Sequence, residues 1–316
     1  MRTILFISVL LPCIICSCTK EVEIDIPGYE EQLVIDGRIE TGQPPFVLIS
    51  RTKDIYAPTD LQSFIDGFVS GAIVTVSNGT TTVQLEELCT NNIPPGTEAI
   101  VADILGIPVE DLANFNICGY VSLDPFIFGE IGKTYTLNVV AEGNTYSSST
   151  QILPPTPLNS VYWQPDGALA DYGYSWASLS DPPGQFDAYK WEIKRINTDS
   201  TGNPIDANFT EPFSPVFNDD FFDGFTFDFF YDNPHGYEDG VLNEYSGLYP
   251  IGDTIVIKFS KMDKSVYEFM EKKYTQLATG GNPFATPTNI PTNIEGGALG
   301  VWAGYSPSFD TLICAP

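Results

Sequence analysis

Short apolar runs separated by turn residues constrain the fold of this chain most. They occupy residues 32–39, 46–50, 72–76, 81–85, 133–140 and 145–152. The turn Ser77-Asn78-Gly79 lies between two of these runs, and an Asn-Gly pair in that setting predicts a hairpin because it favours positive φ. With 25 Pro and 27 Gly in the chain, short strands and turns are favoured over long helices. The pattern predicts a mainly β fold that opens with an immunoglobulin-like β-sandwich over residues 28–153.

An inserted loop at residues 90–120 breaks this β rhythm. A stretch from Pro108 to Asn114 favours a short helix, with proline near its first turn. Cys89 and Cys118 lie near the two ends of the insertion, and we expect them to form a disulfide in an oxidising compartment. In the chain-entropy model such a bridge is worth roughly 3–4 kcal/mol, so it would pin a long loop that has no core of its own.

Residues 153–157, Leu-Pro-Pro-Thr-Pro, form the best candidate domain boundary, because proline favours extended chain and lacks a backbone donor. A second β-rich domain is predicted over residues 154–316, with strands at 189–196 and 254–259. It also carries one long helix at about 263–279. This helix begins with an aspartate N-cap, repeats apolar residues at helical spacing and ends at a Gly-Gly pair.

The first residues are typical of an exported protein. Residues 4–15 are mainly apolar but too few to span a bilayer, so residues 1–17 are interpreted as a signal peptide. Ile15-Cys16-Ser17-Cys18 is close to a lipobox, which predicts lipidation of Cys18 and a lipidated tether over residues 18–27. The alternative is a plain cleaved signal peptide, with Cys18 free or in a disulfide.

The formal net charge is −27, from 14 Lys and Arg against 41 Asp and Glu. A nucleic-acid binder needs cations to displace counterions from phosphates, and adhesion to anionic headgroups needs them too. We therefore expect no nucleic-acid partner and no adhesion of the folded body to anionic lipid. The charge favours solubility outside the cell, or attraction of cations, basic peptides or a basic partner surface.

Familiar catalytic motifs are absent from the sequence. It has no Gly-x-Ser-x-Gly, His-Glu-x-x-His or Walker motif, and His235 is the sole histidine. The body also lacks a Cys-x-x-Cys pair, which argues against a zinc site. Cys314, third from the end, is expected to be free or disordered. We therefore predict no catalytic residues and no enzyme activity. A hydrolase that uses His235 or a pair of carboxylates remains an alternative.

The most unusual stretch runs from Asn218 to Asn233, with five aspartates, seven aromatics and no cation. Exposed aromatics usually mark interaction sites, so an interface or packed loop is favoured over a small-ligand site. The candidate partner-binding or ligand-binding residues here are Phe221, Phe222, Phe225, Phe227, Phe229, Phe230 and Tyr231. Asp219, Asp220 and Asp223 are candidate ligands of a structural Ca²⁺, although the EF-hand spacing is absent, and no other cofactor is expected.

Motifs near both ends of the chain fit one known family. Those near the C-terminus are Gly281-Asn282-Pro283-Phe284-Ala285, Pro287-Thr288-Asn289-Ile290, Asn293-Ile294-Glu295-Gly296-Gly297 and the segment from Leu299 to Ser306. Near the N-terminus, Val22 to Pro27 and Leu33 to Gly37 follow the lipobox cysteine. Over nearly the whole mature chain, the sequence resembles the DUF4249 family of Bacteroidota lipoproteins. That family has no assigned activity, so no catalytic residue is carried over.

The resemblance implies a cellular context. Such lipoproteins look like companions of TonB-dependent outer-membrane β-barrels, and Lys20, Glu21 and Glu23 resemble an export signal to the cell surface. We expect an accessory subunit, lipid-anchored in the outer membrane and facing the exterior, that captures or gates a ligand or assembles the complex. Besides the aromatic segment, contacts would come from Asn282, Phe284, Asn289, Trp302 and Tyr305. The alternatives are a free-standing glycan- or peptide-binding module and a hydrolase.

Overall fold

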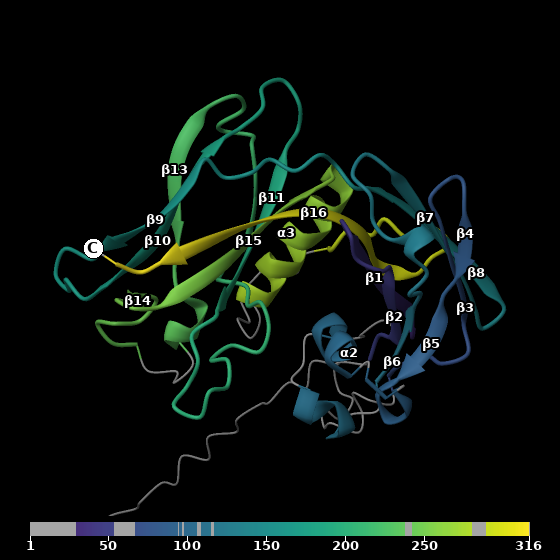
Figure 1. Cartoon of the computed structure of the whole chain (residues 1–316). Coiled ribbons are helices and arrows are strands. Elements are labelled where there is room, and N and C mark those ends of the chain that lie inside the picture. The colour runs from purple at the N-terminus through teal and green to yellow at the C-terminus, as the bar shows by residue number, and fades with distance from the viewer. Residues whose placement is uncertain are drawn as a thin grey trace, which may run out of the picture. The chain divides into compact units, whose positions relative to one another are not determined.

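The computed structural model in Figure 1 describes residues 30–53, 67–237, 242–279 and 289–315, apart from residues 94, 97, 106–108 and 115–116. The predicted signal peptide, Cys18 with its predicted lipidation and the predicted tether lie outside the described residues, as do Asn282 and Phe284. The chain is mainly β and forms several sheets, which confirms the predicted fold class. In the part that the structure describes, no helix is both long and apolar enough to cross a membrane.

The largest sheet has eight strands in the order β12-β11-β15-β16-β1-β2-β6-β5, and we call it the central sheet. Its strands are β1 (Leu33–Glu40), β2 (Phe46–Arg51), β5 (Glu86–Cys89), β6 (Cys118–Val121), β11 (Ala188–Arg195), β12 (Val216–Asn218), β15 (Thr254–Met262) and β16 (Leu299–Ile313). β1 and β16 run parallel, whereas the other neighbouring pairs are antiparallel.

Two smaller sheets pack against the central sheet. The first comprises β3 (Ile73–Ser77), β4 (Thr82–Gln84), β7 (Thr134–Ala141) and β8 (Asn144–Gln151). The second comprises β9 (Ser160–Pro165), β10 (Tyr172–Ser180), β13 (Thr226–Tyr231) and β14 (Tyr249–Pro250). The first shares a buried core with β1 and β2, and the second shares another with β11 and β15. Each small sheet and the strands that it faces form a sandwich-like arrangement of two layers, because alternate residues of each strand face the shared core.

β16 shows how one strand serves three packed regions. Trp302 lies in the core with β1, and Leu312 lies in the core with β11 and β15. Val301, Ala303 and Tyr305 alternate with them and face the opposite side of the sheet. The opposite side is partly covered by α3 (Lys264–Thr279), the long helix that the sequence predicts almost to the residue.

The central sheet runs across the predicted boundary between domains 28–153 and 154–316. Its parallel pair joins β1, from the first predicted domain, to β16, from the second. Glu31–Pro316 forms one compact unit. The two-domain division stays a prediction, and its two parts share one hydrogen-bonded sheet.

The described residues of the insertion at 90–120 form three short helical elements. They are η1 (Thr90–Asn92), α2 (Glu98–Leu105) and η2 (Val109–Asn114), with η3 (Pro125–Ile127) and η4 (Pro234–Tyr237) elsewhere in the chain. The predicted helix near 108–114 is therefore a 3-10 helix, and α2 precedes it. Cys89 and Cys118 are cross-strand neighbours on β5 and β6 and form the predicted disulfide, which is confirmed.

Candidate functional site

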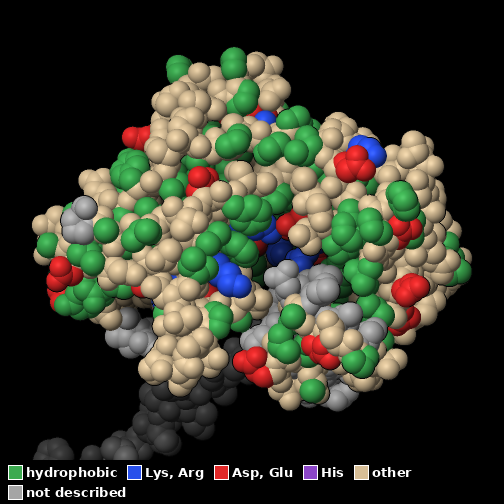
Figure 2. All heavy atoms as spheres, in the orientation of Figure 1, with side chains coloured by type: hydrophobic (Ala, Val, Ile, Leu, Met, Phe, Trp, Pro, Cys, Tyr) green, Lys and Arg blue, Asp and Glu red, His purple; other side chains and the backbone are tan. Residues whose placement is uncertain are grey.

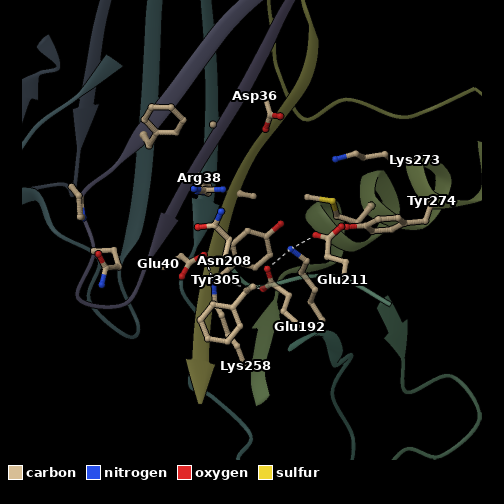
Figure 3. Close-up of a pocket in the computed structure, with 18 of the residues that line it drawn as sticks. Asp36, Arg38, Glu40, Glu192, Asn208, Glu211, Lys258, Lys273, Tyr274 and Tyr305 are labelled. Carbon is tan, nitrogen blue, oxygen red and sulfur yellow. Dashed lines mark hydrogen bonds and ion pairs between the residues drawn. The ribbon is translucent and has the colours of Figure 1, made fainter. Parts of the chain in front are cut away.

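A cavity of about 290 Å³ opens on the side of the central sheet that carries α3. Figure 2 shows the hollow near the centre of one face, with Lys and Arg side chains deep inside it. Strands β1, β11, β15 and β16, helix α3 and the segment 208–211 contribute its walls. Figure 3 shows the labelled side chains of these elements converging on the same space.

The alternation of β1 explains why charged residues reach this cavity. Ile35 and Ile39 are fully buried in the core on one side of the strand. Asp36, Arg38 and Glu40 alternate with this buried set and line the cavity on the other side of the strand. This alternation in the sequence is typical of an ordinary half-exposed strand. The polar side of β1 becomes the wall of a cavity because α3 and the 208–211 segment pack over it.

The cavity concentrates charge of both signs. Its cationic groups are Arg38, Lys190, Lys258 and Lys273, and its anionic groups are Asp36, Glu40, Glu192 and Glu211. Four of the 14 basic residues in a chain of net charge −27 therefore line one small space. The lining is locally balanced, unlike the strongly acidic chain as a whole.

Ion pairs connect most of these charges. Lys190 Nζ lies 2.6 Å from Glu211 Oε1 and 3.2 Å from Glu192 Oε1. Lys258 Nζ lies 2.9 Å from Glu40 Oε1 and 3.5 Å from Glu192 Oε2. Glu192 and Lys258 are register partners on β11 and β15, so the sheet pairing itself places opposite charges side by side. Figure 3 shows this network across the floor of the cavity.

Burial and pairing act against each other on these groups. Burial disfavours the charged form of Lys190, but Glu192 and Glu211 outweigh it and raise its pKa well above the usual value. Burial likewise opposes ionisation of Glu192, yet Lys190 and Lys258 lower the pKa of this carboxyl. Both groups are therefore charged at neutral pH. The Lys190 and Glu192 side chains are only 11% and 12% exposed. Removing either charge would therefore leave the other charge buried with fewer counter-charges, which costs free energy.

Aromatic rings surround the paired charges. The Lys190 Nζ lies 5.7 Å from the centre of the Tyr305 ring, and Lys258 Nζ lies 5.7 Å from that of Phe209. At this range the ring face attracts a cation. Tyr305 is 4% exposed, and its hydroxyl has no hydrogen-bond partner among the described residues. Burial raises the pKa of Tyr305, so this hydroxyl stays protonated and able to donate.

The structure distributes the residues predicted from the C-terminal motif over different environments. Tyr305 lines the cavity, whereas Trp302 is fully buried beneath the sheet and its Nε1 donates to Tyr135 O at 2.9 Å. Asn289 is exposed. Partner or ligand binding by these residues stays a prediction, and Tyr305 is the one that the structure brings into the cavity.

The aromatic-acidic segment divides between core and surface. Phe222, Phe227, Phe229 and Tyr231 pack against the core that β11 and β15 share with the second small sheet. Phe221 is 94% exposed, Phe225 is 65% exposed and Phe230 is 45% exposed. Within β13, strand alternation explains why Phe229 and Tyr231 face the core while Phe230 between them is exposed. Phe221, Phe222 and Phe225 lie in the turn that precedes β13.

The predicted calcium ligands are only partly brought together. Asp219 and Asp223 lie with Asp181, and one carboxylate oxygen of each falls within 4.8 Å of the others. Asp220 Oδ2 instead accepts a hydrogen bond from Asn218 Nδ2 at 2.8 Å. Asp181 and Asp223 already accept bonds from Tyr189 and from a backbone amide. Calcium binding here stays a prediction.

His235 lies outside the cavity lining. Its Nε2 is 3.2 Å from Asp206 Oδ2, and Arg195 also binds that carboxylate, with Nη2 2.6 Å from Oδ1. Burial would raise the pKa of Asp206, but His235 and Arg195 outweigh it and hold this pKa well below its usual range. The histidine thus belongs to a separate cluster that joins β11 to the segment around residue 206.

Sequence reasoning missed most of the cavity. Lys190, Glu192 and Lys258 lie on strands that the sequence predicts, where alternate charges are typical of a solvated face. Their convergence depends on the pairing of β11 with β15 and of β1 with β16. One signal was available in the sequence, because cations are so scarce that several of them on predicted strands indicate a specific use.

Over the residues that the structure describes, the protein is mainly β, with a central sheet, two smaller sheets against it and a charged cavity beside the long helix α3. The sequence family described as a domain of unknown function, DUF4249, has a model that matches residues 19–309. The chain therefore belongs to the DUF4249 family, as its terminal motifs indicate. Among curated proteins, none matches this chain.

Proposed function

We propose that this protein is a non-enzymatic lipoprotein on the outer face of the outer membrane, anchored through Cys18, that serves as an accessory subunit of a TonB-dependent transporter-like β-barrel. In this role it captures a small ligand and presents it to the barrel. The observation that carries the proposal is the charged cavity, in which four cations and four carboxylates of an acidic chain converge. Specific ligand sites combine such enclosed space with a few placed polar groups.

The anchor supports a barrel as the partner. The tether of residues 18–27 is short, so a protein lipidated at Cys18 works close to the membrane surface. An acidic body does not adhere to anionic headgroups by itself. The protein is therefore expected to act together with an integral membrane partner.

Three measurements test the anchored accessory role. Cys18→Ser is expected to release the protein from the membrane fraction, and mass spectrometry of the wild type should find the lipid on the N-terminal fragment. Purification in mild detergent after crosslinking should recover an outer-membrane barrel with the wild type. A monodisperse lipoprotein with no barrel attached would contradict the accessory role, and an unmodified Cys18 would contradict the anchor.

A second candidate function is a free-standing glycan- or peptide-binding module, and one surface favours it. The exposed side of β10 carries Tyr174 and Trp176, which contact Phe230 of β13 with ring centres 5.0 and 4.8 Å apart. Tyr162 of β9 lies 6.2 Å from Trp176 with nearly parallel rings. We call these four residues the aromatic platform. Its neighbour Asp228 accepts a hydrogen bond from Tyr162 at 3.4 Å, so rings and a carboxylate are presented together.

The aromatic platform can be tested apart from the membrane. A glycan array and a peptide pull-down with the soluble ectodomain should find a ligand that Trp176→Ala loses, since stacking area is removed. Phe126→Ala is a matched control, because Phe126 is 75% exposed and is not part of the platform. A ligand held equally by both variants would contradict binding at the platform.

A further inference from the structure

We propose that the charged cavity binds a small zwitterion, namely a free amino acid or a short peptide with a carboxylate and an ammonium group in one molecule. The proposal rests on the ligand-capture role above and names the ligand class for the same cavity. Its volume of about 290 Å³ lies near the lower end of ligand cavities, roughly 300–1,000 Å³, so the occupant is small.

The floor of the cavity is already neutralised internally. Lys190 and Lys258 are paired with Glu40, Glu192 and Glu211 at 2.6 to 3.5 Å. Arg38 also acts electrostatically on Glu192, so three cations face three carboxylates. The net charge of a charged ligand would find no free counter-charge at this floor. Such a ligand is disfavoured, because burying an unpaired charge is costly. A neutral molecule that carries both charges fits it.

Groups without a protein ion pair lie around the rest of the cavity. Lys273 of α3 contacts the ring of Tyr274, 5.8 Å from its Nζ, and neither Lys273 nor Asp36 of β1 is in an ion pair within the described residues. Figure 3 shows Lys273 and Asp36 on opposite walls, with the Tyr305 hydroxyl in the space below them. Asp36 is close enough to act electrostatically on Tyr305.

These three groups match the two ends of a zwitterion. A carboxylate would pair with Lys273 and accept the hydrogen bond that the buried Tyr305 hydroxyl does not make within the protein. An ammonium group would pair with Asp36. The unpartnered hydroxyl is the independent indication of a ligand, because a buried donor without a partner costs free energy that a bound acceptor recovers.

The test begins with the full chain, purified in mild detergent. The standard free L-amino acids and a series of Ala-X dipeptides are screened by thermal shift, and the best probe is measured by titration calorimetry. Its N-acetylated and C-amidated forms are then measured in the same way. We expect each blocked form to bind more weakly by about tenfold or more, since each lacks one charge.

Two variants assign each charge to its partner. Lys273→Gln should weaken the parent and the N-acetylated probe but leave the weak binding of the amidated probe unchanged. Asp36→Asn should weaken the parent and the amidated probe but not the acetylated one. Lys272→Gln is the matched control, because Lys272 is adjacent on α3, pairs with Glu271 at 3.1 Å and is not part of the cavity lining. Tyr305→Phe should weaken the probes that keep a carboxylate while leaving the melting temperature unchanged or higher.

Three results would overturn the inference: no probe binds, the blocked forms bind as tightly as the parent, or the penalties of Lys273→Gln and Asp36→Asn do not depend on which end is blocked. The accessory role is judged separately by recovery of the barrel. Probe binding without a barrel contradicts the accessory role alone, and a recovered barrel without probe binding contradicts the zwitterion alone.

Discussion

At the scale of single residues, Gly37 on β1 has no room for a side chain. A Cβ at this position would lie 2.6 Å from Trp302 Cε3 and 3.3 Å from Val47 Cγ2. The Trp302 ring cannot easily give way, because it is fully buried and held by its hydrogen bond to Tyr135 O. The sequence predicts Trp302 as a contact residue for a partner, which stays a prediction, and the structure shows its ring packed across the parallel strand pair. A local motif cannot distinguish these two uses, since the side that β16 buries is set by distant strands.

Gly37→Ala is therefore expected to lower the free energy of unfolding by roughly 1–3 kcal/mol, the usual cost of one extra methyl in a filled core. Denaturant unfolding measures the change. Gly167→Ala serves as the control, because a Cβ there meets nothing within 4 Å and should alter stability by less than about 1 kcal/mol. An equal loss in both variants would show that the clash with Trp302 is not the cause.

At the scale of elements, strands whose large apolar residues face inward are the easiest to predict from the sequence. β1 and β7 bury alternate large apolar residues and are easily recognised. β10 inverts this pattern, because it buries Gly173, Ser175 and Ala177 and turns its aromatic rings outward. Periodicity of hydrophobic size therefore gives no signal for β10, although it is the central strand of its sheet. The same inversion creates the aromatic platform.

The start of α3 shows one carboxylate serving two elements. Asp263 Oδ1 accepts from Val266 N at 3.0 Å, which caps the helix as the sequence predicts. Asp263 Oδ2 accepts from Thr150 Oγ1 at 2.8 Å. The Thr150 Oγ1 in turn accepts from Gly304 N at 2.9 Å. One side chain thus joins α3 to β8 and β16, beyond what a capping rule predicts.

Asp263→Ala should lower the free energy of unfolding by roughly 1–3 kcal/mol, because it removes both the cap and the bond to Thr150. Asp263→Asn retains an acceptor oxygen and is a good N-cap, so its loss should stay below about 1 kcal/mol. Thermal or chemical unfolding compares the two variants. Equal losses would mean that the negative charge, and not the hydrogen bonds, carries the stabilisation.

At the scale of the whole molecule, the cavity could not be predicted from the sequence. Its charged residues come from β1, β11, β15, α3 and the segment 208–211, and no local pattern relates these parts. The parallel pairing of β1 with β16 is also non-local, since it joins strands near opposite ends of the described chain. The composition limited which residues could supply cations to such a site, because the chain has only 14 Lys and Arg. Their convergence is conspicuous once the fold is known.

The ion-pair network of the cavity gives the protein a predictable dependence on pH. Despite burial, Lys190 and Lys258 lower the pKa of Glu192 below its usual 4.5. Its contribution to stability is therefore present above pH 4.5 and is lost as the pH falls through the lowered value. The raised pKa of Lys190 acts in the opposite range, where stability is present below its usual 10.5 and is lost as the pH rises through the folded value.

Glu192→Gln should thus cost roughly 1–3 kcal/mol at neutral pH, since the bonds to Lys190 and Lys258 lose their charge. The difference between variant and wild type should shrink as the pH falls below 4.5 and through the lowered pKa, because Glu192 becomes protonated in the wild type. Glu130→Gln is the control, because Glu130 and its partner Lys133 are largely exposed and such pairs contribute about 0–1 kcal/mol. Urea unfolding at several pH values makes the comparison. A penalty for Glu192→Gln that stays constant into acid would mean that the network is stabilised by packing and not by the ionised carboxylate.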